Sequence, residues 1–224
     1  MAKAGAPVLG IVGGLASGKS TVARLLEQRG ARVVDADRIG HQMLELAEVR
    51  EALREAFGEC IFEAGNQVSH ERLADAVFGR PQMVQKLNAI VHPRILREIR
   101  GQVQMHRKEQ GVPLVVLDAA LLVETNLDRD MCSALLFVET PRPLRRERAA
   151  GRHISPEQFE KREQSQLPEE EKKERADYVV SNTGSLEDLK DQVERLWPCL
   201  CRLNAAGRTE EGTSLSDKRV TKTK

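Results

Sequence analysis

The chain has 224 residues, with 35 Lys and Arg against 34 Asp and Glu, so its formal net charge is +1. This balance gives no general attraction to nucleic acid or to anionic membranes, and an aromatic content of 3% offers few surfaces on which single-stranded bases could stack. No apolar run approaches the roughly 18 residues of a membrane span, and the first residues lack a signal-peptide core, so we expect a cytoplasmic protein that binds neither nucleic acid nor a membrane.

The first element in the chain carries the strongest pattern. An apolar run at 8–12 predicts a buried strand, and residues 13–20 follow it as Gly-Gly-Leu-Ala-Ser-Gly-Lys-Ser. A periodic apolar stretch from Thr21 predicts a helix directly after this loop. In this context the string is a phosphate-binding P-loop, whose backbone N–H groups and helix N-terminus bind phosphate oxygens. Lys19 then lies near the β- and γ-phosphates, and the Ser20 hydroxyl coordinates Mg²⁺. The sequence therefore predicts a nucleoside triphosphate site.

Four further short apolar runs predict strands, at 31–35, 113–118, 134–138 and 177–182. Segments with a helical pattern separate these runs, so we expect a five-stranded parallel sheet with helices on both faces. The capping signature Ser185-x-x-Asp188 predicts the start of a last helix that runs to about residue 201.

Residues 38–111 read as a mostly helical insertion into this sheet. The helical patterns are 49–57, 71–78 and a long stretch from 81 to 108. Pro93 interrupts the last of these and predicts a helix boundary. We therefore expect a core at 1–37 and 112–203, a helical domain at 38–111, a lid at about 141–168 and a disordered tail at 204–224.

Carboxylates follow two of the predicted strands at the edge where ligands bind in open α/β sheets. Asp35 and Asp37 end the second strand, and Asp118 ends the third. If the second strand extends that far, Asp35 and Asp37 point the same way. Asp37 fits two roles, a base that deprotonates an acceptor hydroxyl or the N-cap of the helix that begins at Arg38, and one carboxylate could serve as both.

Arginines are concentrated after the fourth predicted strand. Guanidinium groups pair well with phosphate oxygens and with the charge of a transferred phosphoryl group. For most of them a solvated helix face, paired with nearby glutamates, is the better explanation, and one or two that face the nucleotide would suffice. The five are Arg142, Arg145, Arg146, Arg148 and Arg152.

Several segments together resemble the dephospho-coenzyme A kinase family, a family of P-loop small-molecule kinases. They are Gly-Ile-Val-Gly-Gly-Leu-Ala-Ser-Gly-Lys-Ser-Thr-Val from Gly10, Val-Val-Asp-Ala-Asp-Arg-Ile-Gly-His from Val33, Leu-Asn-Ala-Ile-Val-His-Pro-Arg-Ile from Leu87, Leu-Asp-Ala-Ala-Leu-Leu-Val-Glu from Leu117, and the pattern from Gln164 to Gly184. The P-loop is generic, whereas the Asp-Ala-Asp and His-Pro segments are more specific. Ala120 departs from the proline usual in the family.

The resemblance implies a three-layer α/β/α P-loop kinase fold with a helical substrate domain and a short lid. It implies transfer of the ATP γ-phosphoryl group to the ribose 3′-hydroxyl of dephospho-CoA, giving CoA and ADP in the last step of coenzyme A biosynthesis, with Mg²⁺ as cofactor.

By matching position, the resemblance also implies the site residues. Asp37, Lys19 and Arg148 are the expected catalytic residues, with Arg145 and Arg152 also eligible as the lid arginine that contacts phosphate. His92 fits a buried structural group near the substrate. ATP contacts are expected from Gly14, Leu15, Ala16, Ser17, Gly18, Lys19, Ser20, Thr21, Arg145 and Asn182. Substrate contacts are expected from Asp35, Asp37, His92, Asp118 and Leu121, and the metal contact from Ser20.

Other functions fit the residues less well. The nearest is another P-loop kinase, for a nucleoside monophosphate or a sugar-like alcohol. A GTP-dependent switch predicts an Asn-Lys-x-Asp string, which the sequence lacks. A nucleic-acid ATPase needs a basic stripe that the composition does not offer. The oligomeric state is expected to be a monomer or a weak homo-oligomer.

Overall fold

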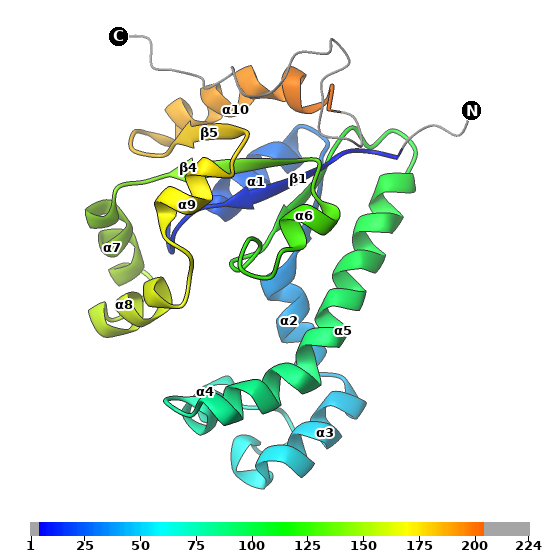
Figure 1. Cartoon of the computed structure of the whole chain (residues 1–224), viewed down its shortest axis with the longest axis vertical. Helices are drawn as coiled ribbons and strands as arrows, with labels where there is room; N and C mark the ends of the chain where they lie inside the picture. The colour runs from blue at the N-terminus through cyan, green and yellow to red at the C-terminus, as the bar shows by residue number, and fades with distance from the viewer. Residues whose placement is uncertain (1–4, 204–224) are drawn as a thin grey trace. The chain divides into compact units, whose positions relative to one another are not determined.

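The computed structural model describes residues 5–203, so the expected disordered tail lies outside the described residues. The chain divides into two compact units, and Ala36–Gln102 forms the second of them (Figure 1). The first unit combines the chain before Ala36 with the chain after Gln102. Among the described residues, no helix is both long and apolar enough to cross a bilayer.

The first unit is built on a parallel sheet. Within residues 5–203 five strands pair in the order β2-β3-β1-β4-β5, and each neighbouring pair is parallel. This confirms the predicted sheet and its strands. The strands are β1 (Val8–Val12), β2 (Arg32–Asp35), β3 (Val115–Asp118), β4 (Ala134–Glu139) and β5 (Tyr178–Ser181).

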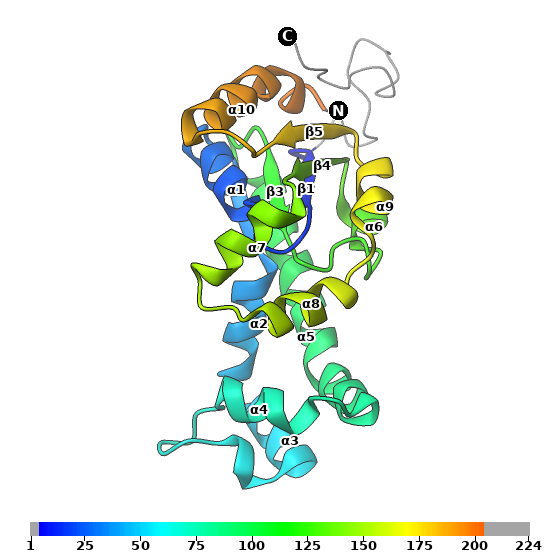
Figure 2. The same ribbon diagram turned by 90° about the vertical axis from the view of Figure 1, so that its left-hand side faces the viewer.

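Helices cover both faces of this sheet, as the uninterrupted apolar strands require. In Figure 2 the sheet lies between α1 (Lys19–Gln28) and α10 (Leu186–Leu200) on one side and α6 (Leu127–Met131) and α9 (Glu169–Glu174) on the other. The apolar stripe of α10 packs with that of α1 in the main core. Its predicted capping box at Ser185 is confirmed, because the Ser185 hydroxyl accepts from the Asp188 N–H.

Two further helices follow β4 in the first unit. They are α7 (Arg142–Ala150) and α8 (Pro156–Gln164). Phe159 of α8 and Ala149 of α7 are buried against Ala16 of the P-loop. The segment predicted as a lid therefore contacts the P-loop through apolar side chains.

The second unit is helical and has a hydrophobic core of its own. Val49, Leu53, Leu73 and Val91 belong to that core, which explains why this insertion forms a separate compact body. Its elements are α2 (Ala36–Leu44), α3 (Ala47–Phe57), η1 (Glu59–Ile61), α4 (His70–Val77) and most of α5 (Pro81–Lys108).

The expected helix boundary at Pro93 is wrong, because α5 continues through it. Proline lacks the N–H that would bond to the carbonyl one turn earlier, and this loss destabilises a helix interior. On either side of it, Val91 and Ile95 pack into the core of the second unit. Tertiary packing of this kind outweighs the local preference and keeps both halves of α5 helical.

The second unit also ends earlier than the predicted limit of residue 111. The last turns of α5 belong to the first unit, where Val103 is buried and the Arg107 side chain donates from Nε to the Ala6 carbonyl over 3.0 Å. A continuous helix thus belongs to both units. The assignment of the second unit to substrate binding stays a prediction.

Candidate active site

The P-loop connects the buried end of β1 to α1, as predicted. Gly18 has a φ of 99°, in the left-handed region that side chains disfavour, and a Cβ there would overlap with the side-chain amide of Asn182. Ala16 and Ser17 are buried in the loop, while Lys19, Ser20 and Thr21 form the first turn of α1.

The ends of β4 and β5 hold this loop. The Thr140 hydroxyl and the Asn182 side-chain amide both donate to the Ser17 carbonyl oxygen, over 2.8 and 2.7 Å. Among the described residues, the buried Ser17 hydroxyl has no hydrogen-bond partner. Asn182, expected near ATP, thus lies directly against the loop.

Lys19 is anchored to the loop that precedes it. Its Nζ donates to the carbonyl oxygens of Gly13 and Gly14, over 3.0 and 2.9 Å. The Gly14 carbonyl also accepts from the Ser17 N–H over 3.2 Å. The ammonium is therefore held by the first part of the loop rather than left to move freely.

The expected carboxylates lie at the carboxyl edge of the sheet, where β2 and β3 end together. Asp35 and Asp118 are register partners on these neighbouring strands, and Asp118 is buried. Leu121, three residues beyond Asp118, is exposed.

Asp37 differs from its predicted setting. Helix α2 begins at Ala36, so Asp37 is exposed in the first helical turn and does not precede the helix as an N-cap. The strand ends at Asp35, so the condition under which Asp35 and Asp37 would alternate on one strand is not met. A carboxylate in a first turn is still favoured by the helix dipole.

The eligible lid arginines have different environments. Arg145 is fully buried, and its guanidinium pairs with Glu163 over 2.6 Å and with Glu169 over 2.7 Å. Arg148 is half-buried and donates from Nη2 to the Asn182 carbonyl over 3.0 Å. Arg152 is exposed in the turn after α7.

A family model described as Dephospho-CoA kinase matches residues 7–188 of the chain. The chain belongs to the dephospho-CoA kinase family. Among similar proteins, the Dephospho-CoA kinase of Symbiobacterium thermophilum is 36% identical over 87% of this chain and 81% of its own, and that of Deinococcus radiodurans is 40% identical over 83% and 88%. The crystal structure of TT1252 from Thermus thermophilus is 34% identical and superposes with a TM-score of 0.75, covering 88% of this chain and 98% of that one.

Membership of this kinase family confirms the resemblance drawn from the sequence motifs. It makes the protein a transferase that uses ATP and a small-molecule substrate. The structure of this dephospho-CoA kinase family member also has features that the sequence did not predict. They lie around α8 and α9 and in the second unit.

Two glutamates, one on α8 and one on α9, contact the P-loop backbone. Glu169 accepts from the Gly14 N–H and Glu163 from the Leu15 N–H, each over 3.1 Å. Burial, the largest effect, raises the pKa of Glu169 above its ordinary value, while Arg145 acts in the opposite direction. Nothing in the local sequence distinguishes these glutamates from their neighbours.

A second buried ion pair joins the segment after β3 to α9. Lys172 is almost fully buried, and its Nζ lies 2.9 Å from Glu124 Oε1 and 2.8 Å from the Gln166 side-chain oxygen. Burial opposes ionisation of Glu124, but hydrogen bonds from Lys172 and from backbone N–H groups, including that of Leu167, outweigh it and lower the pKa of this carboxyl. The motif residues quoted for the family thus form one structural contact.

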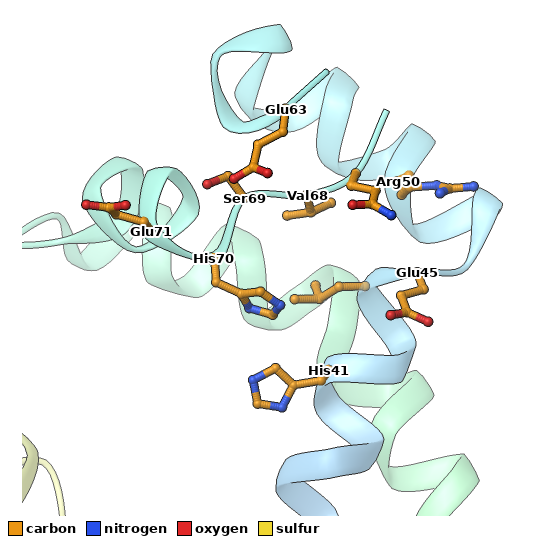
Figure 3. Close-up of a pocket in the computed structure, with 10 residues that line it drawn as sticks. His41, Glu45, Arg50, Glu63, Val68, Ser69, His70 and Glu71 are labelled. Carbon is orange, nitrogen blue, oxygen red and sulfur yellow. The ribbon is translucent and has the colours of Figure 1, made fainter. Parts of the chain in front are cut away.

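The second unit contains a cavity of about 670 Å³. Figure 3 shows the rings of His41 and His70 turned toward one another, and their centroids lie 4.7 Å apart. The charged side chains that line the cavity are mainly acidic: Glu45, Glu63 and Glu71, with Arg50. His92, expected near the substrate as a buried group, is instead exposed on α5.

Proposed function

We propose that the protein transfers the γ-phosphoryl group of ATP to the ribose 3′-hydroxyl of dephospho-CoA, giving CoA and ADP. The observation that carries this proposal is a complete P-loop, with Lys19 anchored on the Gly13 and Gly14 carbonyls, in a chain whose residues 7–188 match the Dephospho-CoA kinase family model. The substrate follows from the family, and the P-loop supplies the donor half of the reaction.

On the donor side, the loop amides after Leu15 and the N-terminus of α1 bind the triphosphate, since the Gly14 and Leu15 N–H groups donate to glutamates. Lys19 stabilises the charge that develops on the β- and γ-phosphate oxygens. Arg148 extends this charge stabilisation from α7, since its guanidinium lies beside Asn182 at the edge of the loop. The buried Arg145 contributes through the residues that it holds, and its direct contact with ATP remains a prediction.

On the acceptor side, Asp37 is the proposed general base. An exposed carboxylate directly after the carboxyl end of β2 can accept the proton of the attacking hydroxyl. Asp35, Asp118, His92 and Leu121 are proposed substrate contacts. The second unit is the proposed substrate domain.

Magnesium is the proposed metal. The Ser20 hydroxyl is exposed in the first turn of α1, and hydroxyl oxygens together with water suit a hard cation such as Mg²⁺. When bound, the ion neutralises phosphate charge during transfer. The protein itself contributes the Ser20 oxygen and the alignment of the loop.

A panel of acceptors tests the proposal. Purified protein with Mg-ATP should release ADP when dephospho-CoA is added, and the product should match authentic CoA in mass and chromatography. AMP, adenosine and shikimate should give much less ADP under the same conditions. Equal turnover with those acceptors would reject dephospho-CoA as the substrate and favour another small-molecule kinase. The Lys19→Met variant is the blank for contaminating kinases.

A further inference from the structure

Two consecutive peptide groups of the P-loop are held from both sides. The first joins Gly13 to Gly14 and the second joins Gly14 to Leu15. The carbonyl of each accepts a hydrogen bond from Lys19 Nζ, and the N–H of each donates to a glutamate, Glu169 for the first peptide and Glu163 for the second. Because the C=O and N–H of a trans peptide point in opposite directions, fixing the N–H toward its glutamate fixes the carbonyl toward Lys19.

The glutamates are themselves fixed by one buried arginine. Glu163 and Glu169 each place one carboxylate oxygen on the loop and the other on Arg145. The Arg145 side chain is 2% exposed, and its Nε donates to the Thr140 carbonyl over 3.1 Å. These three residues, the glutamate clamp, therefore have little freedom to reorient.

The same side chains also lie close to the Cα of Gly14. Its φ is not in the left-handed region, so backbone conformation does not require a glycine there. Space does, because a Cβ on Gly14 would lie 2.5 Å from Arg145 Nη1 and 2.6 Å from Glu169 Oε1. The clamp thus packs directly onto the Cα of Gly14, at the centre of the two held peptides.

We propose that Glu163 and Glu169, held by Arg145, are positioning residues for Lys19. They act through the two peptide groups, whose carbonyls keep the ammonium aimed at the phosphates. Without Glu169, the peptide between Gly13 and Gly14 can rotate and Lys19 loses its anchor on the Gly13 carbonyl. The Gly14 carbonyl is also held by the Ser17 N–H, so the loss of Glu163 should have the smaller effect. This inference rests on the proposed function for its catalytic consequence, whereas its effect on ATP binding requires only the P-loop.

A thermodynamic cycle on ATP binding tests the link to Lys19. Mg-ATP affinity is measured by calorimetry for wild type, Glu169→Gln, Lys19→Met and the double variant, without any acceptor. Glu169→Gln should weaken binding about tenfold, comparable to the loss of one hydrogen bond to a charged group. In the Lys19→Met background the same change should have little effect, since there is no ammonium left to position. Because no acceptor is present, the result tests the role of the glutamates whether or not dephospho-CoA is the substrate.

Controls distinguish positioning from general destabilisation. Glu170→Gln changes the exposed neighbour on α9 and should leave ATP affinity unchanged. Glu163→Gln, on a different helix, should weaken ATP binding in the same direction but by less, because the Ser17 N–H also holds the Gly14 carbonyl. The test therefore survives if one variant fails to fold. With dephospho-CoA as acceptor, kcat and the KM for ATP should change while the KM for dephospho-CoA does not. Equal weakening by Glu169→Gln with and without Lys19, or no weakening at all, would overturn the proposal.

Discussion

The side-chain amide of Asn182 donates to the carbonyl oxygen of Ser17 over 2.7 Å, although 165 positions separate the two residues in the sequence. This bond ties the end of β5 to the centre of the P-loop. The same amide occupies the space beside Gly18 in which a side chain would otherwise lie. The end of β5 and the P-loop glycine are therefore matched to each other.

Gly18→Ala should abolish tight ATP binding while leaving the sheet folded. The new Cβ would displace Asn182 and would also place alanine at a φ of 99°. Calorimetry with Mg-ATP measures the loss, and circular dichroism reports the fold. Gly30→Ala, at a similar φ of 100° but with open space around it, is the matched control and should retain ATP affinity. Equal loss in both variants would make backbone strain alone responsible.

Local patterns predicted the strand–loop–helix around the P-loop and the start of the last helix. The P-loop string and the Ser185 capping box each depend on residues within one turn or loop, so a short stretch of sequence contains every residue that determines them. The long α5 was predicted in two parts, because the packing of Val91 and Ile95 around Pro93 is not visible in a local window.

The contacts that the sequence did not predict join distant segments. Glu163 and Glu169 contact the loop from 148 and 155 positions away in the sequence. Both lie in strongly charged segments in which no local pattern distinguishes one glutamate from the next. Asp37 shows that small errors in a predicted helix boundary also matter. Helix α2 begins two residues earlier than expected, so Asp37 lies in the first turn of the helix and is not its N-cap. Boundaries of this kind depend on the end of β2 rather than on the aspartate itself.

Asp37→Asn should lower kcat by about 10²-fold or more if the carboxylate is the general base, because asparagine cannot accept the hydroxyl proton. Steady-state kinetics with Mg-ATP and dephospho-CoA measure this, and the thermal midpoint should change little because Asp37 is exposed. Asp75→Asn, on exposed α4 of the same unit, is the control. Near-normal turnover in Asp37→Asn would limit this carboxylate to its interaction with the helix dipole.

Lys172→Met should lower the free energy of unfolding by about 3 kcal/mol, because it leaves the Glu124 carboxylate largely buried without its ammonium. Urea unfolding at neutral pH measures the change. Lys173→Met is a neighbouring control, since its ion pair with Glu139 is half-exposed and is worth less than about 1 kcal/mol. Similar losses of unfolding free energy in the two variants would mean that burial does not make the Lys172–Glu124 pair more important for stability than an exposed pair.

Glu109 makes the stability of the first unit depend on pH in the acid range, and this dependence can be measured separately from that of other groups. Hydrogen bonds from Arg32, and then from His106, lower the pKa of Glu109 from 4.5 to about 2. A carboxyl with a lowered pKa stabilises the fold when ionised, so its contribution is complete above about pH 4.5 and is lost as the pH falls toward 2. Glu109→Gln removes this contribution at every pH.

Urea unfolding of wild type and Glu109→Gln should therefore differ at pH 7, and the difference should shrink as the pH is lowered through this window. The difference should be small, because both Arg32 and Glu109 are exposed to solvent and to screening by salt. In an Arg32→Met background, most of the pH-dependent difference should disappear, since the arginine is the first cause of the lowered pKa. A difference that stayed constant down to the lowest pH at which the protein remains folded would show that Glu109 does not titrate in this range.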